Sequence, residues 1–185
     1  TIHKDLNQLL PIYKASFKQS AAKYNLDWHL LAAIGYQESY LKPSSVSPTG
    51  VRGLMMLTNS TAQAMGVSNR SDPIQSIQGG AKYYDLMLDQ FANVPYPDRN
   101  WYALVAYNMG PGAVNQIQKQ IKAQGKDPNQ WVNLYDYLQR NQARNGRYKQ
   151  AVQYVTRIRT YLEHLKTSNR IDVWIQTGKK KLTIG

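Results

Sequence analysis

Residues that start and stop helices recur at short intervals along this chain, and they constrain its fold more than any other feature. Pro11 and Pro111 can each open a helix, and Asp27 and Thr58 can each cap one. Alternating strand patterns are absent before residue 173. The pattern therefore predicts an all-α domain of roughly seven short helices.

The same signals predict where those helices lie. We expect them over residues 11–25, 28–40, 59–66, 73–93, 100–110, 111–125 and 147–167, with a further start at Asp127-Pro128. A loop rich in Pro, Gly and Ser separates the second helix from the third. After Thr167, two short apolar segments could form a hairpin. We favour a basic tail, because an isolated hairpin is marginally stable in water. The expected division is a domain over 1–168 and a basic C-terminal tail over 169–185.

Charge and composition narrow the classes of protein that fit. The 185 residues include 23 Lys and Arg against 11 Asp and Glu, a net charge of +12. Residues 140–185 hold eleven basic and two acidic residues, which places nine of those twelve charges in the last quarter. Such a surplus indicates a polyanionic partner, but without a recognition motif we expect no nucleic acid. The absence of Cys excludes disulfides, Cys-based metal sites and thiol nucleophiles.

The sequence gives no sign of a metal or cofactor. His3, His29 and His164 lack metal-ligand spacing, and no phosphate loop or dinucleotide fingerprint occurs. No apolar run is long enough to cross a bilayer. We expect no cofactor.

One acidic residue stands out. Glu38 is one of only two Glu residues, and at helical spacing it shares an apolar face with Leu31, Ile34 and Gly35. Burial favours the protonated form of a carboxyl group, which can then act as a general acid. A buried structural Glu that is satisfied by a backbone amine or by an Arg such as Arg52 fits this position equally well. Position alone leaves both interpretations open.

Four ordered motifs carry a resemblance to a known family. They are Glu38-Ser39, the segment from Ser47 to Leu57, the segment from Ala106 to Gly110, and Tyr154-Val155 with Ile158. In this order, over about residues 13–165, they resemble the lytic transglycosylase domain, a family with a goose-type lysozyme-like fold that cleaves bacterial peptidoglycan. The resemblance implies a helical domain with a substrate cleft, and it makes residues 1–168 the catalytic domain.

The resemblance also implies roles for particular residues. Glu38 would be the catalytic acid and then the base, and Tyr154 would orient its carboxyl group. The substrate would be bound by residues of the first three motifs: Ser39, Met55, Met56, Tyr107 and Asn108. Many members of the family carry Gln at the position of Met56, so this chain lacks one polar group there.

The implied reaction is non-hydrolytic cleavage of the bond between N-acetylmuramic acid and N-acetylglucosamine, which leaves a 1,6-anhydro sugar. The alternatives are a hydrolytic muramidase and a non-catalytic wall-binding module. The implied partner is the glycan strand of peptidoglycan, an anionic polymer that the net positive charge suits. The resemblance further implies a periplasmic location at the inner face of the outer membrane. It also implies an N-terminal regulatory domain that this chain does not include.

Overall fold

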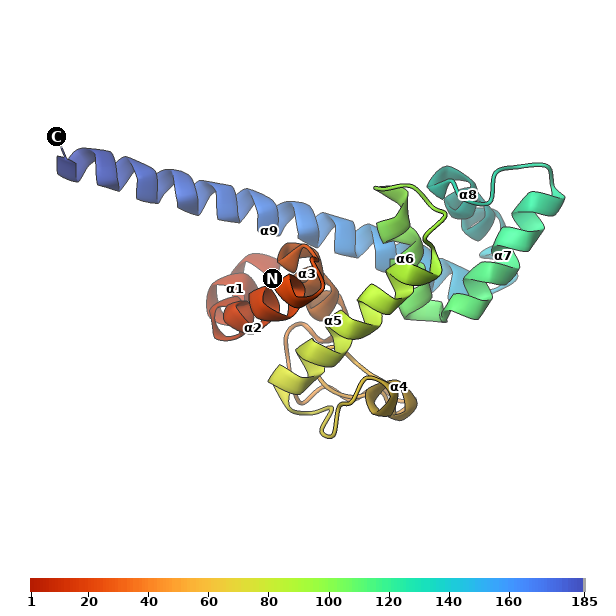
Figure 1. Cartoon of the computed structure of the whole chain (residues 1–185), viewed down its shortest axis with the longest axis horizontal. Coiled ribbons are helices and arrows are strands. Elements are labelled where there is room, and N and C mark those ends of the chain that lie inside the picture. Colours follow the sequence, from red (N-terminus) through yellow and green to blue (C-terminus); the bar gives the residue numbers. More distant parts are fainter. Residues whose placement is uncertain (185) are drawn as a thin grey trace.

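The structure is a computed structural model that describes the backbone of residues 1–184 and the side chains of these residues except 173 and 179–184. This described part is helical, with two isolated β-bridges that pair Arg52 with Val46 and with Leu57. The predicted all-α class is confirmed. The helices are α1 (Ile2–Gln8), α2 (Leu10–Lys23), α3 (Trp28–Ser39), α4 (Asn59–Ala64), α5 (Pro73–Gln90), α6 (Asp98–Met109), α7 (Pro111–Ala123), α8 (Trp131–Asn141) and α9 (Gly146–Ile184) (Figure 1).

Side-chain caps fix several of the helix starts that the sequence predicts. The carboxylate of Asp27 accepts a hydrogen bond from the backbone N–H of His29 at 2.9 Å, and Thr58 caps α4 in the same way. Helix α8 is different. Asp127 accepts from the N–H of Asn129 within a turn, and α8 begins only at Trp131, whose N–H donates to Asp98 of α6 at 2.8 Å. The predicted start at Asp127-Pro128 is wrong because a carboxylate from another helix sets this start.

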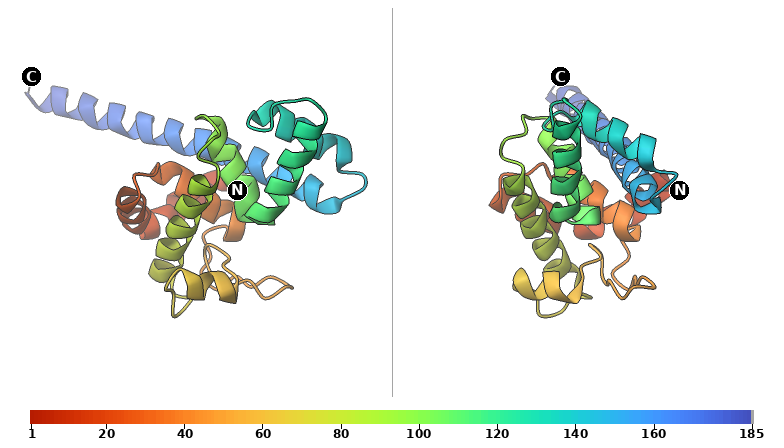
Figure 2. Two further views of the ribbon diagram at one scale, coloured as in Figure 1. Left: turned by 45° about the vertical axis from the view of Figure 1, so that its right-hand side comes forward. Right: turned by 90° about the vertical axis from the view of Figure 1, so that its right-hand side faces the viewer.

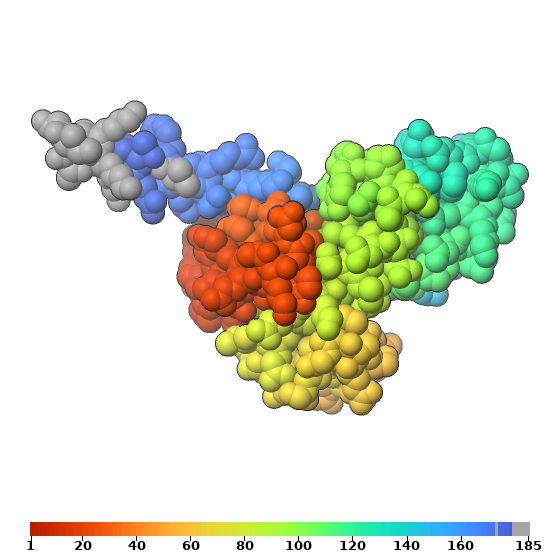
Figure 3. Space-filling view, in the orientation of Figure 1, coloured from red at the N-terminus to blue at the C-terminus, as the bar shows by residue number. Residues whose placement is uncertain are grey.

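The C-terminal segment also differs from the prediction. Neither a hairpin nor an irregular tail follows Thr167, because α9 continues without interruption to Ile184. No proline lies in this stretch to stop the helix. The extension projects from the body of the molecule (Figures 1 and 3), and Ile171 and Trp174 on it are 52% and 77% exposed. The division at residue 168 stays a prediction.

Helix α3 lies at the centre of the fold and is buried along most of its length, from Leu30 to Tyr36. It packs against α2 on one side and α9 on the other, and α5 and α6 complete the core (Figure 2). The predicted apolar stripe of α9 is buried from Ala151 to Leu165. Both ends of α3 therefore have fixed surroundings, and Glu38 lies in its last turn. Among the described helices, none is long and apolar enough to span a membrane.

Candidate active site

Glu38 and Tyr154 form the centre of the site. Glu38 lies half-buried in the last turn of α3, and Tyr154 lies on α9, 4% exposed. The Tyr154 hydroxyl donates to Oε1 of Glu38 at 2.7 Å, across 116 residues of sequence. The structure thus brings the first and the last of the four motifs into direct contact.

The surroundings of Glu38 favour its protonated form. Burial raises the pKa of Glu38 from its ordinary value to about 7, and the hydrogen bond from Tyr154 opposes that shift in part. Burial and the nearby Glu38 both raise the pKa of Tyr154, so its hydroxyl keeps its proton and acts as a donor. No cation in the described part of the chain forms an ion pair with Glu38. Arg52 is exposed, and the alternative of a Glu38–Arg52 structural pair is wrong.

Ser39 is placed inside the protein. Its side chain is 3% exposed, and its hydroxyl lies 2.7 Å from the carbonyl oxygen of Leu54 and 3.1 Å from that of Gly35. These bonds tie the end of α3 to the segment that follows the loop. Ser39 therefore positions Glu38 relative to that segment, and its predicted contact with a sugar stays a prediction.

The two adjacent methionines have opposite surroundings. Met55 is fully buried, with its side chain packed between Gly35 of α3 and Gly80 of α5. The expectation that Met55 binds the substrate directly is wrong, because its side chain fills the space in the core that the missing side chains of those glycines leave. Met56 is half-buried and adopts a left-handed backbone conformation, with φ of 52°. Of the pair, only Met56 can reach a ligand.

The last turn of α6 brings the third motif to the same place. The hydroxyl of Tyr107 donates to the carbonyl oxygen of Met55 at 3.1 Å, and its ring packs edge-on against Tyr83 of α5. The charge of Glu38 contributes to raising the pKa of Tyr107, after burial, which places the two groups close together. Asn108 is exposed beside Tyr107. Helices α3, α6 and α9 and the segment after the loop thus converge on Glu38.

Three supporting residues on α5 could not be identified from motifs alone. Buried Ser76 accepts from the backbone N–H of Met55 at 2.9 Å, Gly80 leaves room for the Met55 side chain, and Tyr83 supports Tyr107. The pair Gly79-Gly80 in the middle of a helix was the available signal, since glycine there costs helix stability and needs a packing reason.

This fold and this arrangement define a class. The chain belongs to the family of the transglycosylase SLT domain, whose family model matches residues 15–130. Within the described residues, no group of three His, Asp or Glu lies close enough to hold a metal ion. The resemblance that rests on the four motifs is confirmed.

More particular relatives are proteins named membrane-bound lytic murein transglycosylase F. The one from Stutzerimonas stutzeri (strain A1501) is 46% identical over 175 residues, which cover 88% of this chain and 35% of that relative. The one from Pseudomonas fluorescens (strain Pf0-1) is 47% identical over 175 residues, which cover 89% and 36%. The chain thus spans about a third of the length of these curated relatives.

A solved structure shares the fold. It is an inactive mutant of the lytic transglycosylase Slt from Pseudomonas aeruginosa, which matches with a TM-score of 0.67 at 22% identity. The match covers 85% of this chain and 24% of the other. The fold is therefore the all-α, lysozyme-like fold of that enzyme's matching part.

Proposed function

We propose that this chain is the catalytic domain of a peptidoglycan lytic transglycosylase that cleaves the β-1,4 bond between N-acetylmuramic acid and N-acetylglucosamine. The observation that carries this proposal is the buried carboxyl group of Glu38, with a pKa of about 7 and a hydrogen bond from Tyr154. Such a group can give up a proton and take one back at neutral pH. The names of the relatives support murein as the substrate.

The proposed reaction uses Glu38 twice. Protonated Glu38 gives its proton to the glycosidic oxygen, which leaves with N-acetylglucosamine, while the N-acetyl group of the muramic acid stabilises the positive sugar ring. The resulting carboxylate then takes the proton from the C6 hydroxyl of the same sugar as that oxygen bonds to C1. The product is a 1,6-anhydro sugar, and no water is consumed. Tyr154 holds the carboxyl group in one orientation during both proton transfers.

The positions of the nearest acidic residues in the sequence support a mechanism with one carboxylate. Asp27 caps the opposite end of α3, and eleven helical residues place it on the order of 16 Å from Glu38 along the axis. Two-carboxylate glycosidases hold their acidic groups ~5–9.5 Å apart. Asp72 caps the start of α5 and bonds to the N–H of Gln75. Asp27 is therefore too far from Glu38 for such a pair, and the carboxylate of Asp72 is used in a helix cap.

We further propose that Met56, Tyr107 and Asn108 contact the glycan beside Glu38, because each lies at the site and is at least partly exposed. Ser39 and Met55 act from below this surface by fixing the backbone. The membrane-bound relatives support a periplasmic location, which we propose to be the inner face of the outer membrane. A regulatory domain in the remaining length of the full protein belongs to the same proposal.

Digestion of purified peptidoglycan followed by mass spectrometry of the released fragments tests the reaction. We expect fragments that end in anhydro-muramic acid and are lighter by one water than lysozyme products. Reducing-end muramic acid as the main product would show a hydrolytic muramidase instead. Release of no fragments would leave only a wall-binding module.

The Glu38→Gln variant tests the assignment of the acid. It keeps the size of the side chain but removes the transferable proton, so turnover should fall by ~10²–10⁴ while wall binding persists. Asp89→Asn, which neutralises an exposed carboxylate on α5, is the matched control and should leave turnover unchanged. Equal turnover in the Glu38→Gln variant and the parent would remove Glu38 from its role.

A further inference from the structure

Three hollows share lining residues: α9 lines the first two, and the third lies between the start of α6 and the start of α8. Their volumes are about 690, 630 and 490 Å³. Arg159 and Glu163 line both the first and the second, Tyr96 lines the first and the third, and Trp131 lines the second and the third. Each pair of these hollows shares lining residues, and we call the three together the aromatic groove.

Glu163 of the groove lies on the other side of α9 from the site around Glu38, whereas Tyr84 in the first hollow is near enough to Tyr154 to contribute to raising its pKa. Glu163 follows Tyr154 on α9 by nine residues, about two and a half helical turns, so the two side chains lie on opposite sides of the helix axis. Tyr154 points at Glu38, and Glu163 therefore lies on the far side of α9 from it. At the other end of α3, Asp27 lines the first hollow.

Aromatic rings recur along the groove. Tyr96 is 57% exposed, and the half-buried rings of Trp131 and Tyr135 lie 5.8 Å apart. The Arg159 guanidinium lies 4.1 Å from the centre of the Trp101 ring, which fixes a cation in the wall that the first two hollows share. Flat aromatic surfaces with polar edges are suited to the apolar faces of sugar rings.

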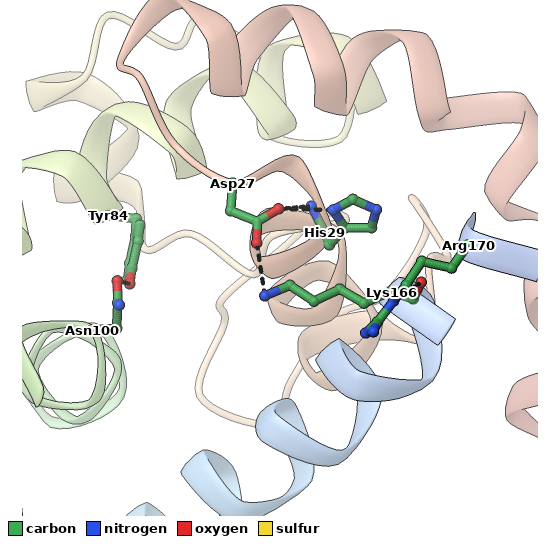
Figure 4. Close-up of polar contacts among 6 residues, drawn as sticks. All are labelled: Asp27, His29, Tyr84, Asn100, Lys166 and Arg170. Atoms are coloured by element: carbon green, nitrogen blue, oxygen red, sulfur yellow. Dashed lines mark hydrogen bonds and ion pairs between the residues drawn. The ribbon is translucent and has the colours of Figure 1, made fainter. Parts of the chain in front are cut away.

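Polar groups face each other across the first hollow (Figure 4). On one wall, Lys166 forms an ion pair with Asp27 at 3.4 Å, and on the other the Tyr84 hydroxyl donates to Asn100 at 3.0 Å. Because that bond uses the amide oxygen of Asn100, its N–H₂ group is left to donate to a ligand. The lining of the groove thus combines partly exposed rings and the amide of Asn100 with charged groups of both signs: the cations Arg159 and Lys166 and the carboxylates Asp27, Asp98, Asp127 and Glu163.

We propose that the aromatic groove is an accessory binding site for a glycan strand of peptidoglycan. This inference rests on the proposed function, since it names a second site for the same polymer. Amino sugars supply the ring faces and N-acetyl groups, and lactyl and peptide carboxylates supply the anions that Arg159 would meet, since Lys166 is already paired with Asp27. The mixture of both charges with partly exposed rings is less suited to a second protein domain, whose interface would be depleted of charge at its centre.

The accessory site would hold the enzyme on the wall while another strand, or another part of the same strand, reaches Glu38. It should therefore matter for the insoluble polymer and not for short fragments. Tyr96 and Tyr135 are suitable residues to remove, because they line different hollows and neither is buried. Tyr137 on α8 is a matched control: it is half-buried like Tyr135 but two residues further on, about 200° around the helix, and it lines none of the three hollows.

The test compares Tyr96→Ala/Tyr135→Ala with Tyr137→Ala, each in the inactive Glu38→Gln chain, by co-sedimentation with insoluble peptidoglycan. We expect the double variant to bind ~5–10-fold more weakly and the control to bind as its parent does. In chains that keep Glu38, the double variant should release products more slowly from insoluble peptidoglycan but turn over a soluble tetrasaccharide fragment at the unchanged rate. Circular dichroism and thermal melting confirm that the variants are folded, and the Tyr96→Ala single variant serves if the double variant is not.

Unchanged binding by the folded double variant would overturn the inference. The inference would also fail if the double variant lost wall binding only in the full-length protein, because another segment of that protein would then occupy the groove. Equal slowing on the soluble fragment would also count against it, since the groove would then act through the active site. If the chain released no anhydro product at all, the proposed function would fail, and the binding comparison in the inactive background would still decide the role of the groove.

Discussion

In the reaction that we propose, the carboxyl group of Glu38 has to be protonated at the first step, so its pKa should set the pH range of activity. With a pKa of about 7, kcat/KM should fall as the pH rises through neutrality. The hydrogen bond from Tyr154 lowers that pKa, and removing it should have the opposite effect. We expect Tyr154→Phe to be slower, because the acid is less well oriented, and to lose activity at a higher pH than the parent.

The pH–rate profile on a soluble fragment checks this prediction. Tyr161→Phe is a suitable control, since Tyr161 also lies half-buried on α9 but packs its ring against Tyr36. If the fall of activity at high pH stays in place in the Tyr154→Phe variant, or moves to lower pH, Tyr154 does not act on the titration of Glu38.

Burial of Glu38 also has a cost in stability, and its sign follows from the direction of the shift. Below the ordinary value of 4.5, Glu38 is protonated in both the folded and the unfolded chain. Between that value and about 7, only the unfolded chain ionises, so the free energy of unfolding falls as the pH rises. Glu38→Gln has nothing to ionise. It should gain roughly 1–3 kcal/mol over the parent between pH 4 and pH 8.

Thermal melts of both proteins at pH 4, 6 and 8 measure this difference. A difference in stability between them that is the same at all three pH values would contradict the linkage.

At this scale the sequence was a good guide to Glu38, because a carboxyl group on an apolar helix face is visible at helical spacing. It was a poor guide to Met55, whose surroundings depend on glycines of two different helices.

Helix α5 supports the active site through a space that a single methyl group would fill. A Cβ atom on Gly80 would lie 2.7 Å from both Cγ and Cε of Met55, so the Met55 side chain could not yield by moving its end alone. We expect Gly80→Ala to lower the stability by ~1–3 kcal/mol and to reduce activity, because Met55 carries the carbonyl group that Tyr107 binds. Gly112→Ala in α7, where no atom lies within 4 Å, is the control and should be neutral or stabilising.

Chemical denaturation and turnover of both variants provide the measurement. A Gly80→Ala protein as stable and active as the parent would show that the core accepts the methyl group.

The helices themselves were largely predictable, since Asp27, Thr58 and Asp72 cap their helices as the sequence indicates. The start of α8 was not predictable, because it depends on a carboxylate of α6. The length of α9 was not predictable either, because no proline marks where this helix ends.

At the scale of the whole molecule, the positive charge is concentrated in residues 140–185, which carry nine of the twelve net charges. Ending the chain at Thr167 removes Arg170, Asp172 and the run 179–181, a net loss of three positive charges, and leaves every proposed site residue in place. If this segment attracts the anionic wall, binding should weaken as salt shortens the screening length from ~10 Å at 0.1 M to ~3 Å at 1 M. The truncated chain should show a flatter salt dependence.

Sedimentation with insoluble peptidoglycan across a salt series compares the two chains. The same salt profile and affinity for both would mean that the extension has no part in wall binding.

The overall class and the family were predictable at this scale, because four motifs in a fixed order carry them. The aromatic groove was not predictable, because Tyr96 lies in the turn before α6, Trp131 and Tyr135 lie on α8, and these residues share no motif.

The long-range contact between Glu38 and Tyr154 means that the chemistry we propose is latent in an incomplete chain. Glu38 is made early, but the ring that orients it arrives 116 residues later, and burial requires the C-terminal helix to have docked. A copy that is still being synthesised, is truncated before α9 or has misfolded carries only an ordinary carboxylate, ionised at neutral pH and unable to serve as the acid. The proposed chemistry would thus appear only in copies whose C-terminal helix has docked against α3.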